Sequence, residues 1–171
     1  MATGTLTSVE EYLDTSYRPD CEYVDGVVLE RNVGEMDHSS LLTSLGCYLC
    51  LRQKKWGTIT LMTVRVQVKV TQIRVPDLCV ILRPVPSDPV VQKPPFICIE
   101  VLARQDTVES MQDRIDDYLA MGVPYVWLLN PRRRRAFVYT SGGIHEVKDG
   151  ILRTENPEIV VPLAEVFSEI E

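Results

Sequence analysis

The sequence predicts an α/β domain in which a mixed central sheet packs against helices and carries a β-hairpin toward each end of the chain. Apolar residues recur with helical spacing in residues 38–56 and 107–121. Two short and almost continuously apolar runs, residues 96–103 and 125–129, are typical of strands covered on both faces. Because a helix separates these two strands, a right-handed parallel crossover is expected between them.

The first elements are a short helix over residues 7–13, which begins with a capping box, and a hairpin over residues 22–29. The hairpin turn is Asp25-Gly26, a pair that tolerates the positive φ angles of a two-residue turn. In this register Glu22 opposes Leu29 and shares a face with three apolar residues. We therefore expect Glu22 to point inward.

A long core helix is predicted over residues 38–56, with leucines at helical spacing and Gly57 just beyond its end. His38 lies in its first turn, three residues before Leu41. That spacing puts its imidazole on the stripe that faces the core.

Strands and one loop fill the middle of the chain. Residues 64–70 alternate strictly between apolar and polar, which predicts a half-exposed strand. Residues 73–81 form an apolar run interrupted by Asp77, and residues 84–95, with five prolines, form a loop. The next strand carries Glu100 and should be central in the sheet.

A second long helix is capped by Asp106 or Thr107 and ends before Gly122. The residues of its apolar stripe, which should be buried, are Val108, Met111, Ile115, Tyr118 and Leu119.

The remaining chain completes the sheet. A strand at residues 125–129 is followed by a hairpin of residues 136–140 and 144–148, and a closing helix is expected at residues 163–170. Without a repeat or a linker in the sequence, one domain over residues 1–171 accounts for the whole chain.

Composition limits the function. The chain has 171 residues and a net charge of −6, which disfavours binding to nucleic acid by broad phosphate neutralisation. Arg132 to Arg135 concentrate positive charge in one loop, which could contact phosphates or a partner, although a solvated turn is the commoner explanation. No segment approaches the ~20 apolar residues of a membrane span, and residues 1–7 lack a secretory signal. We expect a cytoplasmic protein without membrane contact.

Five cysteines are scattered through the chain, and we expect reduced thiols that act as small hydrophobes. Cys47 and Cys50 form a CxxC pair, but it lies in mid-helix and no second pair stands at ligand spacing. Zinc binding and redox chemistry are therefore not expected.

Asp77 and Glu100 are the strongest functional signal, because carboxylates on core strands are costly unless they are paired or bind a metal. If the loop between them brings their strands together, the two side chains supply oxygen ligands for a hard divalent cation. The alternative is that each carboxylate pairs with a buried arginine, such as Arg74 or Arg114, or reaches solvent at a strand end.

Three further groups point to the same core. Glu22 is placed inward by hairpin pairing and His38 by helical phase, and neither placement refers to a function. Arg114 lies on the edge of its helix's buried stripe, from where it could reach Glu100. It could equally serve only to neutralise the acids. Several inward polar groups near one core would be costly without a site to serve.

These residues, in this order, resemble a known family. Val75-Pro76-Asp77 and Ile99-Glu100-Val101-Leu102 are similar to the motif of the PD-(D/E)XK nuclease superfamily, whose restriction-endonuclease-like core has a helix, a three-strand meander, a helix and a strand. More specifically, the chain from about Glu22 to Tyr139 resembles the Uma-two family of putative restriction endonucleases. The further residues that carry this resemblance are Glu22 to Gly26, His38, Tyr118, Gly122 to Pro124 and Trp127 to Pro131.

The resemblance implies a magnesium- or manganese-dependent endonuclease acting on DNA. Asp77, Glu100 and the backbone carbonyl of Val101 are then the expected metal ligands, with Glu22 and His38 in support. The motif's lysine is replaced by Leu102, and the position to which the family's lysine has moved is Arg114 here. An arginine keeps the positive charge but cannot act as a general base near neutral pH.

Three hypotheses follow. The leading one is a metal-dependent endonuclease, in which Arg114 stabilises charge on the phosphate and His38 orients the attacking water or accepts its proton. The second is a non-catalytic relative that binds nucleic acid or a protein, and the third is a regulatory domain that binds metal without cleavage. Cutting both DNA strands favours a homodimer.

Overall fold

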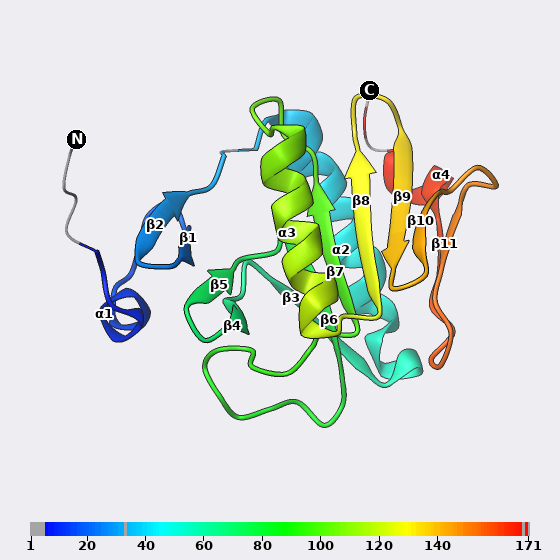
Figure 1. Cartoon of the computed structure of the whole chain (residues 1–171). Helices are drawn as coiled ribbons and strands as arrows, with labels where there is room; N and C mark the ends of the chain where they lie inside the picture. Colours follow the sequence, from blue (N-terminus) through cyan, green and yellow to red (C-terminus); the bar gives the residue numbers. More distant parts are fainter. Residues whose placement is uncertain (1–5, 33, 169, 171) are drawn as a thin grey trace.

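Three sheets and four helices make up the chain in a computed structural model that describes residues 6–32, 34–168 and 170 (Figure 1). The helices are α1 (Val9–Asp14), α2 (Met36–Trp56), α3 (Val108–Met121) and α4 (Leu163–Phe167). The strands are β1 (Cys21–Val24), β2 (Val27–Glu30), β3 (Thr58–Met62), β4 (Val66–Lys69), β5 (Gln72–Arg74), β6 (Leu78–Leu82), β7 (Ile97–Val101), β8 (Tyr125–Asn130), β9 (Arg135–Thr140), β10 (Gly143–Glu146), β11 (Ile151–Arg153) and β12 (Val160–Pro162).

The central sheet has six strands in the order β10-β9-β8-β7-β6-β3. Strands β3, β6 and β7 form an antiparallel meander, and α3 then connects β7 to β8, which runs parallel to it. A second sheet, in the order β2-β1-β5-β4, contains the N-terminal hairpin, and β11 pairs with β12. The mixed sheet and both predicted hairpins are therefore confirmed.

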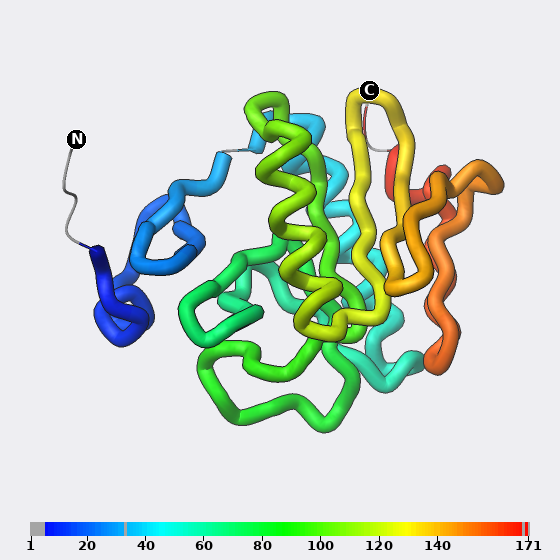
Figure 2. The backbone as a smooth tube through the Cα atoms, viewed as in Figure 1, coloured from blue at the N-terminus to red at the C-terminus, as the bar shows by residue number. Residues whose placement is uncertain are grey.

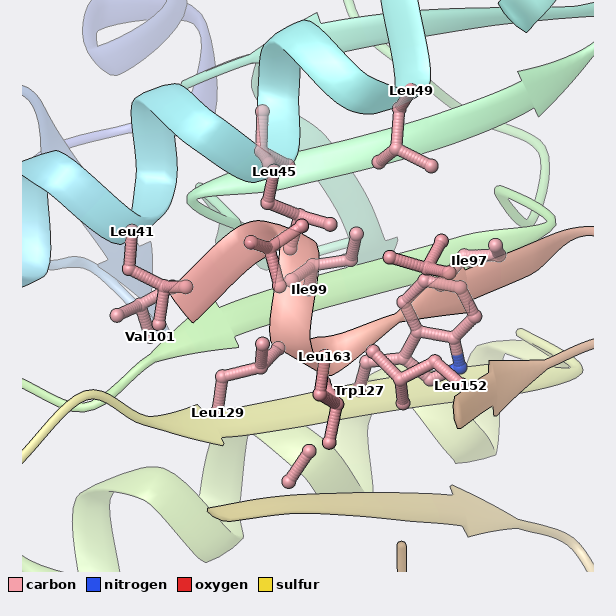
Figure 3. Close-up of a cluster of buried hydrophobic side chains, with 14 of the residues drawn as sticks. Leu41, Leu45, Leu49, Ile97, Ile99, Val101, Trp127, Leu129, Leu152 and Leu163 are labelled. Carbon is pink, nitrogen blue, oxygen red and sulfur yellow. The ribbon is translucent and has the colours of Figure 1, made fainter. Parts of the chain in front are cut away.

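Helices cover the two faces of the central sheet, with α3 on one and α2 on the other (Figure 1). Figure 3 shows the α2 side, where Leu41, Leu45 and Leu49 pack over alternate residues of β7, beginning at Ile97. The intervening residues of β7 face α3 instead, so that Cys98 packs with Met111 and other apolar residues of that helix. Glu100 therefore lies on the face that α3 covers.

The predicted ends of the long helices are confirmed because both have glycine caps. Gly57 and Gly122 are left-handed, with φ angles of 66° and 103°, and their N–H groups bond to carbonyls of the preceding turn. Thr107 caps the start of α3 by accepting a hydrogen bond from Ser110. The prediction that Val108 is buried in α3 is wrong, because its side chain is 89% exposed at the first helical position.

The middle strands differ from the prediction in two ways. Residues 73–81 do not form one strand, because Val75, Pro76 and Asp77 separate β5 in the second sheet from β6 in the central sheet. Pro76 has no N–H for a ladder hydrogen bond, which explains the break. The meander begins with β3, which we did not predict, whereas the alternating segment around β4 pairs with β5.

Smaller differences occur at the chain ends. The first helix begins at Val9 with Ser8 as its cap, two residues later than predicted. The closing helix ends at Phe167, and Glu169 within its predicted range lies outside the described residues, as do residues 1–5 of the segment in which we sought a signal sequence. In the described part of the chain, no helix is long and apolar enough to cross a membrane.

Candidate functional site

Asp77 and Glu100 come together in the fold, as the sequence predicted. Asp77 immediately precedes β6, and Glu100 lies on the adjacent strand β7. Their residues are only 4% and 0% exposed. One nitrogen, Nη2 of Arg31, lies 2.7 Å from Oδ1 of Asp77 and 3.2 Å from Oε2 of Glu100. The two carboxylates, called the acid pair below, therefore converge on a single point.

Each carboxylate of the acid pair has one oxygen anchored by the protein and the other directed at that point. The backbone N–H of Val101 donates to Oδ2 of Asp77 at 2.8 Å, and Nε2 of His38 lies 3.5 Å from the same oxygen. The hydroxyl of Tyr118 donates to Oε1 of Glu100 at 2.7 Å. Oδ1 of Asp77 and Oε2 of Glu100 remain for a shared cation.

The surroundings shift the pKa values of the two carboxylates in opposite directions. Burial, with a smaller contribution from the charge of Asp77, raises the pKa of Glu100 to about 8 despite the opposing charge of Arg31. Burial also acts on Asp77, but hydrogen bonds from His38 and Val101 and the charge of Arg31 lower its pKa below the ordinary value. Near neutral pH the arrangement therefore favours an ionised Asp77 beside a protonated Glu100.

His38 is held against Asp77 at the start of α2. Its residue is 8% exposed, so the predicted inward orientation is confirmed. Burial lowers its pKa, but the hydrogen bond and charge of Asp77 outweigh that effect and raise the pKa above 6.5. Asp77 therefore makes His38 easier to protonate than an isolated imidazole is.

Glu22 is buried, as predicted, but not for the reason we gave. Val27 and Leu29 on the same face of the hairpin are 49% and 40% exposed, so an apolar face does not bury Glu22. Arg74 and Arg114 contact its Oε2 at 2.8 and 3.2 Å, and the N–H of Val75 donates to its Oε1 at 3.2 Å. Ion pairing explains its position.

Arg114 interacts electrostatically with Glu100, but the ion pairs that it forms are with other carboxylates. Within the part of the chain that the structure describes, its ion pairs are with Glu22 and with Asp106, at 3.2 and 3.7 Å. Arg74 likewise bonds to Glu22 and Asp117. The two arginines considered as partners of the acid pair thus serve Glu22, and a different arginine, Arg31, serves the acid pair.

Sequence reasoning missed Arg31, although one signal pointed to it. Val27, Leu29 and Arg31 alternate along the second hairpin strand, so the phase that turns Glu22 inward also turns Arg31 to the same face. The predicted hairpin ended at Leu29, two residues before Arg31. Its continuation would have placed a cation beside the buried acids.

The other predicted features outside the acid pair are readily located. The described cysteines are all free, and Cys47 and Cys50 are exposed on α2. Residues 131–134 form a turn between β8 and β9, in which Pro131 is buried and the three arginines are exposed. Because Leu129 of β8 pairs with Val101 of β7, this turn lies at the end of the sheet that carries Glu100 and Val101. Figure 2 shows the backbone of the β8–β9 connection at that end.

The antiparallel meander, the α3 crossover to β8 and the buried acids immediately before β6 and on the adjacent strand β7 define a restriction-endonuclease-like core. The chain belongs to the Uma2 (Uma-two) family, described as "Putative restriction endonuclease", whose model matches residues 9–168. A crystal structure of a putative nuclease of the DUF820 family from Anabaena variabilis has a similar fold, with a TM-score of 0.81 and 18% identity over 95% of this chain and 98% of that one. No curated protein matches the sequence.

Proposed function

We propose that the protein is a divalent-metal-dependent endonuclease that hydrolyses DNA phosphodiester bonds. The observation that carries this proposal is the arrangement of the acid pair, in which each carboxylate has one anchored oxygen and one oxygen directed at a common point. Hydrogen bonds that orient ligand carboxylates in this way are typical of metal centres. Membership of a family described as restriction endonucleases supports the same function.

The donor set suits a hard cation. Magnesium prefers oxygen ligands, and one or two carboxylates suffice because it retains water and binds substrate phosphate. In residues 6–32, 34–168 and 170, no group of three or more His, Cys, Asp or Glu residues could hold a metal, which disfavours zinc more than magnesium. The proposed holders are Asp77, Glu100 and the Val101 carbonyl. A bound Mg²⁺ or Mn²⁺ would lower the pKa of water and neutralise charge on the phosphate.

The chain's own side chains prepare that chemistry. Tyr118 fixes the rotation of Glu100, and the Val101 N–H fixes that of Asp77. His38 orients Asp77 and accepts a proton from water only when the pH is high enough to leave its imidazole neutral. Glu22 and Arg114 act by position, since the charge of Arg114 lowers the pKa of Glu100 while its ion pair with Glu22 holds its side chain in place.

DNA would be guided by the basic turn between β8 and β9. Arg132 and Arg133 are exposed there, at the end of the sheet where the acid pair lies. A net charge of −6 disfavours binding through broad neutralisation of phosphates, so a local contact with the phosphate backbone is the form of binding we propose. A homodimer in the cytoplasm, with one site for each DNA strand, completes the proposal.

A second candidate is a nuclease-fold module that binds nucleic acid or a protein without cutting. Arg31 favours it, because a guanidinium already occupies the point toward which both carboxylates are directed. The replacement of the motif's lysine by Leu102 favours it as well.

Plasmid cleavage in Mg²⁺ or Mn²⁺ separates these candidates. Wild type is compared with Asp77→Asn, with Glu100→Gln and with Asp88→Asn, a charge-matched control on an exposed loop. We expect cleavage by wild type and the control and none by the two site variants. The double variant Arg132→Gln/Arg133→Gln should bind DNA more weakly and with a shallower salt dependence.

Each alternative outcome has a distinct meaning. DNA binding without cleavage under any metal would support the binding module. Cleavage that persists in Asp77→Asn would show that the activity does not come from this site. If Mn²⁺ also failed to raise the melting temperature of wild type, the metal centre itself would be refuted.

A further inference from the structure

Arg31 closes the acid pair off from solvent. It follows the last residue of β2, in a connection to α2 whose described residues, 31, 32, 34 and 35, have no regular secondary structure. Its side chain is 13% exposed, whereas those of Asp77 and Glu100 are 6% and 0% exposed. A cation from solvent therefore cannot reach the two inward oxygens unless a neighbouring group moves.

The guanidinium of Arg31 is less completely bonded than that of Arg74. Arg74 donates from Nε to Asp117 and from Nη1 to Glu22, and its Nη2 lies 2.8 Å from Asp117. Arg31 contacts both of its acids through Nη2 alone, and its buried Nε has no hydrogen-bond partner among the described residues. An arginine held at one nitrogen, with a buried donor unsatisfied, is released more easily than one held at three.

A metal ion and Arg31 cannot share the point on which the two oxygens converge. Like charges within a few ångströms repel strongly in a buried setting, and the distances of 2.7 and 3.2 Å put Nη2 between the carboxylates. We propose that Arg31 is a displaceable internal cation that occupies the metal position in the metal-free protein and must leave when the metal binds. This inference rests on the metal site of the proposed function.

The inference has a measurable consequence for metal affinity. The protein binds metal only in the fraction of molecules in which Arg31 has moved, so the apparent affinity is lowered by that fraction. Removing the guanidinium should remove this competition. We expect Arg31→Gln to bind Mn²⁺ at least tenfold more tightly than wild type does.

The test is titration of the metal-free full chain with MnCl₂ alone, followed by calorimetry or by the electron paramagnetic resonance signal of free Mn²⁺. The variants are Arg31→Gln, Asp77→Asn and Arg104→Gln. Arg104 lies just after β7, is 71% exposed and pairs with Glu35, so its removal deletes the same charge without freeing the acid pair. We expect Arg104→Gln to differ less than threefold from wild type.

The outcomes distinguish the inference from the function on which it rests. If wild type binds Mn²⁺ in an Asp77-dependent way and Arg31→Gln binds equally or more weakly, displacement is refuted and the metal site stands. If neither wild type nor Arg31→Gln shows Asp77-dependent binding, the metal site and the inference both fail.

A second measurement needs no variant at position 31, which protects the test if Arg31→Gln unfolds. Arginine side-chain Nε–H resonances of ¹⁵N-labelled wild type are followed while MgCl₂ is added. We expect one buried arginine signal to shift and to gain mobility, while those of Arg74 and Arg114 stay in place. A spectrum in which no arginine signal responds, at metal concentrations that saturate the site, would overturn the inference.

Discussion

Two buried groups of arginines and carboxylates lie side by side in this protein and are built differently. The Glu22 cluster, made of Glu22, Arg74, Arg114 and Asp117, balances two carboxylates with two guanidinium groups. The acid pair has two carboxylates and one arginine, with His38 as a second cation only when it is protonated. The Glu22 cluster therefore pairs each carboxylate with a guanidinium, whereas burial raises the pKa of Glu100 to about 8 because the single arginine beside the acid pair does not offset the burial of two adjacent carboxylates.

The largest expected effect comes from a substitution that breaks the Glu22 cluster. Glu22→Gln leaves Arg74 and Arg114 buried without their shared carboxylate, which should lower the free energy of unfolding by about 3–5 kcal/mol. Urea denaturation, with circular dichroism as the probe, measures it. A loss below about 1 kcal/mol would show that Asp117 and Asp106 compensate both arginines, and the contrast between the two groups would disappear.

The corresponding substitution in the acid pair, Glu100→Gln, should raise the free energy of unfolding at high pH instead of lowering it. The pKa of Glu100 is raised from 4.5 to about 8, so the folded state is favoured below pH 4.5 and that advantage is lost as the pH rises to about 8. Glutamine never ionises, so Glu100→Gln should gain stability over wild type as the pH increases. Since each pKa unit corresponds to ~1.4 kcal/mol, the gain at pH 9 is on the order of a few kcal/mol.

This gain is measured by urea denaturation at pH 5 and pH 9 in the presence of a chelator. The attraction between Arg31 and ionised Glu100 is already included in this gain, because it is one of the causes that set the pKa of Glu100. A stability difference between variant and wild type that does not change with pH would mean that Glu100 is not perturbed in the folded protein.

The smallest expected effect lies at the border of the Glu22 cluster. Lys69 contacts Asp117 at 2.7 Å, but its side chain is 50% exposed and the ion pair is screened by solvent. Lys69→Met should change the free energy of unfolding by less than about 1 kcal/mol. A loss near that of Glu22→Gln would extend the cluster to the surface and make its charge balance depend on a third cation.

Local signals in the sequence predicted much of the fold. Asp25-Gly26 set the hairpin register, and Gly57 and Gly122 set the helix ends, because each of these features depends on a few adjacent residues. The choice of strand partners does not depend on adjacent residues alone. Residues 64–70 alternate like any half-buried strand, and nothing in them shows that β4 pairs with β5 instead of joining the meander.

The residues of the candidate site also fall into those with a local signal in the sequence and those without one. Asp77 and Glu100 could be found because a carboxylate in an apolar run is conspicuous by itself. Arg31 lies 46 and 69 residues from these partners in the sequence, and an arginine at the end of an amphipathic strand has no comparable local signature. The partners of Arg74 and Arg114 were misassigned for the same reason, since charge pairing is decided by tertiary position.

The N-terminal hairpin of β1 and β2 limits how far the protein could be shortened. A fragment that begins at α2 would keep Asp77, Glu100 and Val101, which we propose as metal ligands, and it would keep His38. It would also lose both Glu22 and Arg31. Arg74 and Arg114 would then be buried without the carboxylate that they share. Asp77 and Glu100 would be left without the guanidinium that contacts both of them. The hairpin therefore supplies a charged partner to each of the two buried groups, and it could not be removed without leaving their ion pairs incomplete.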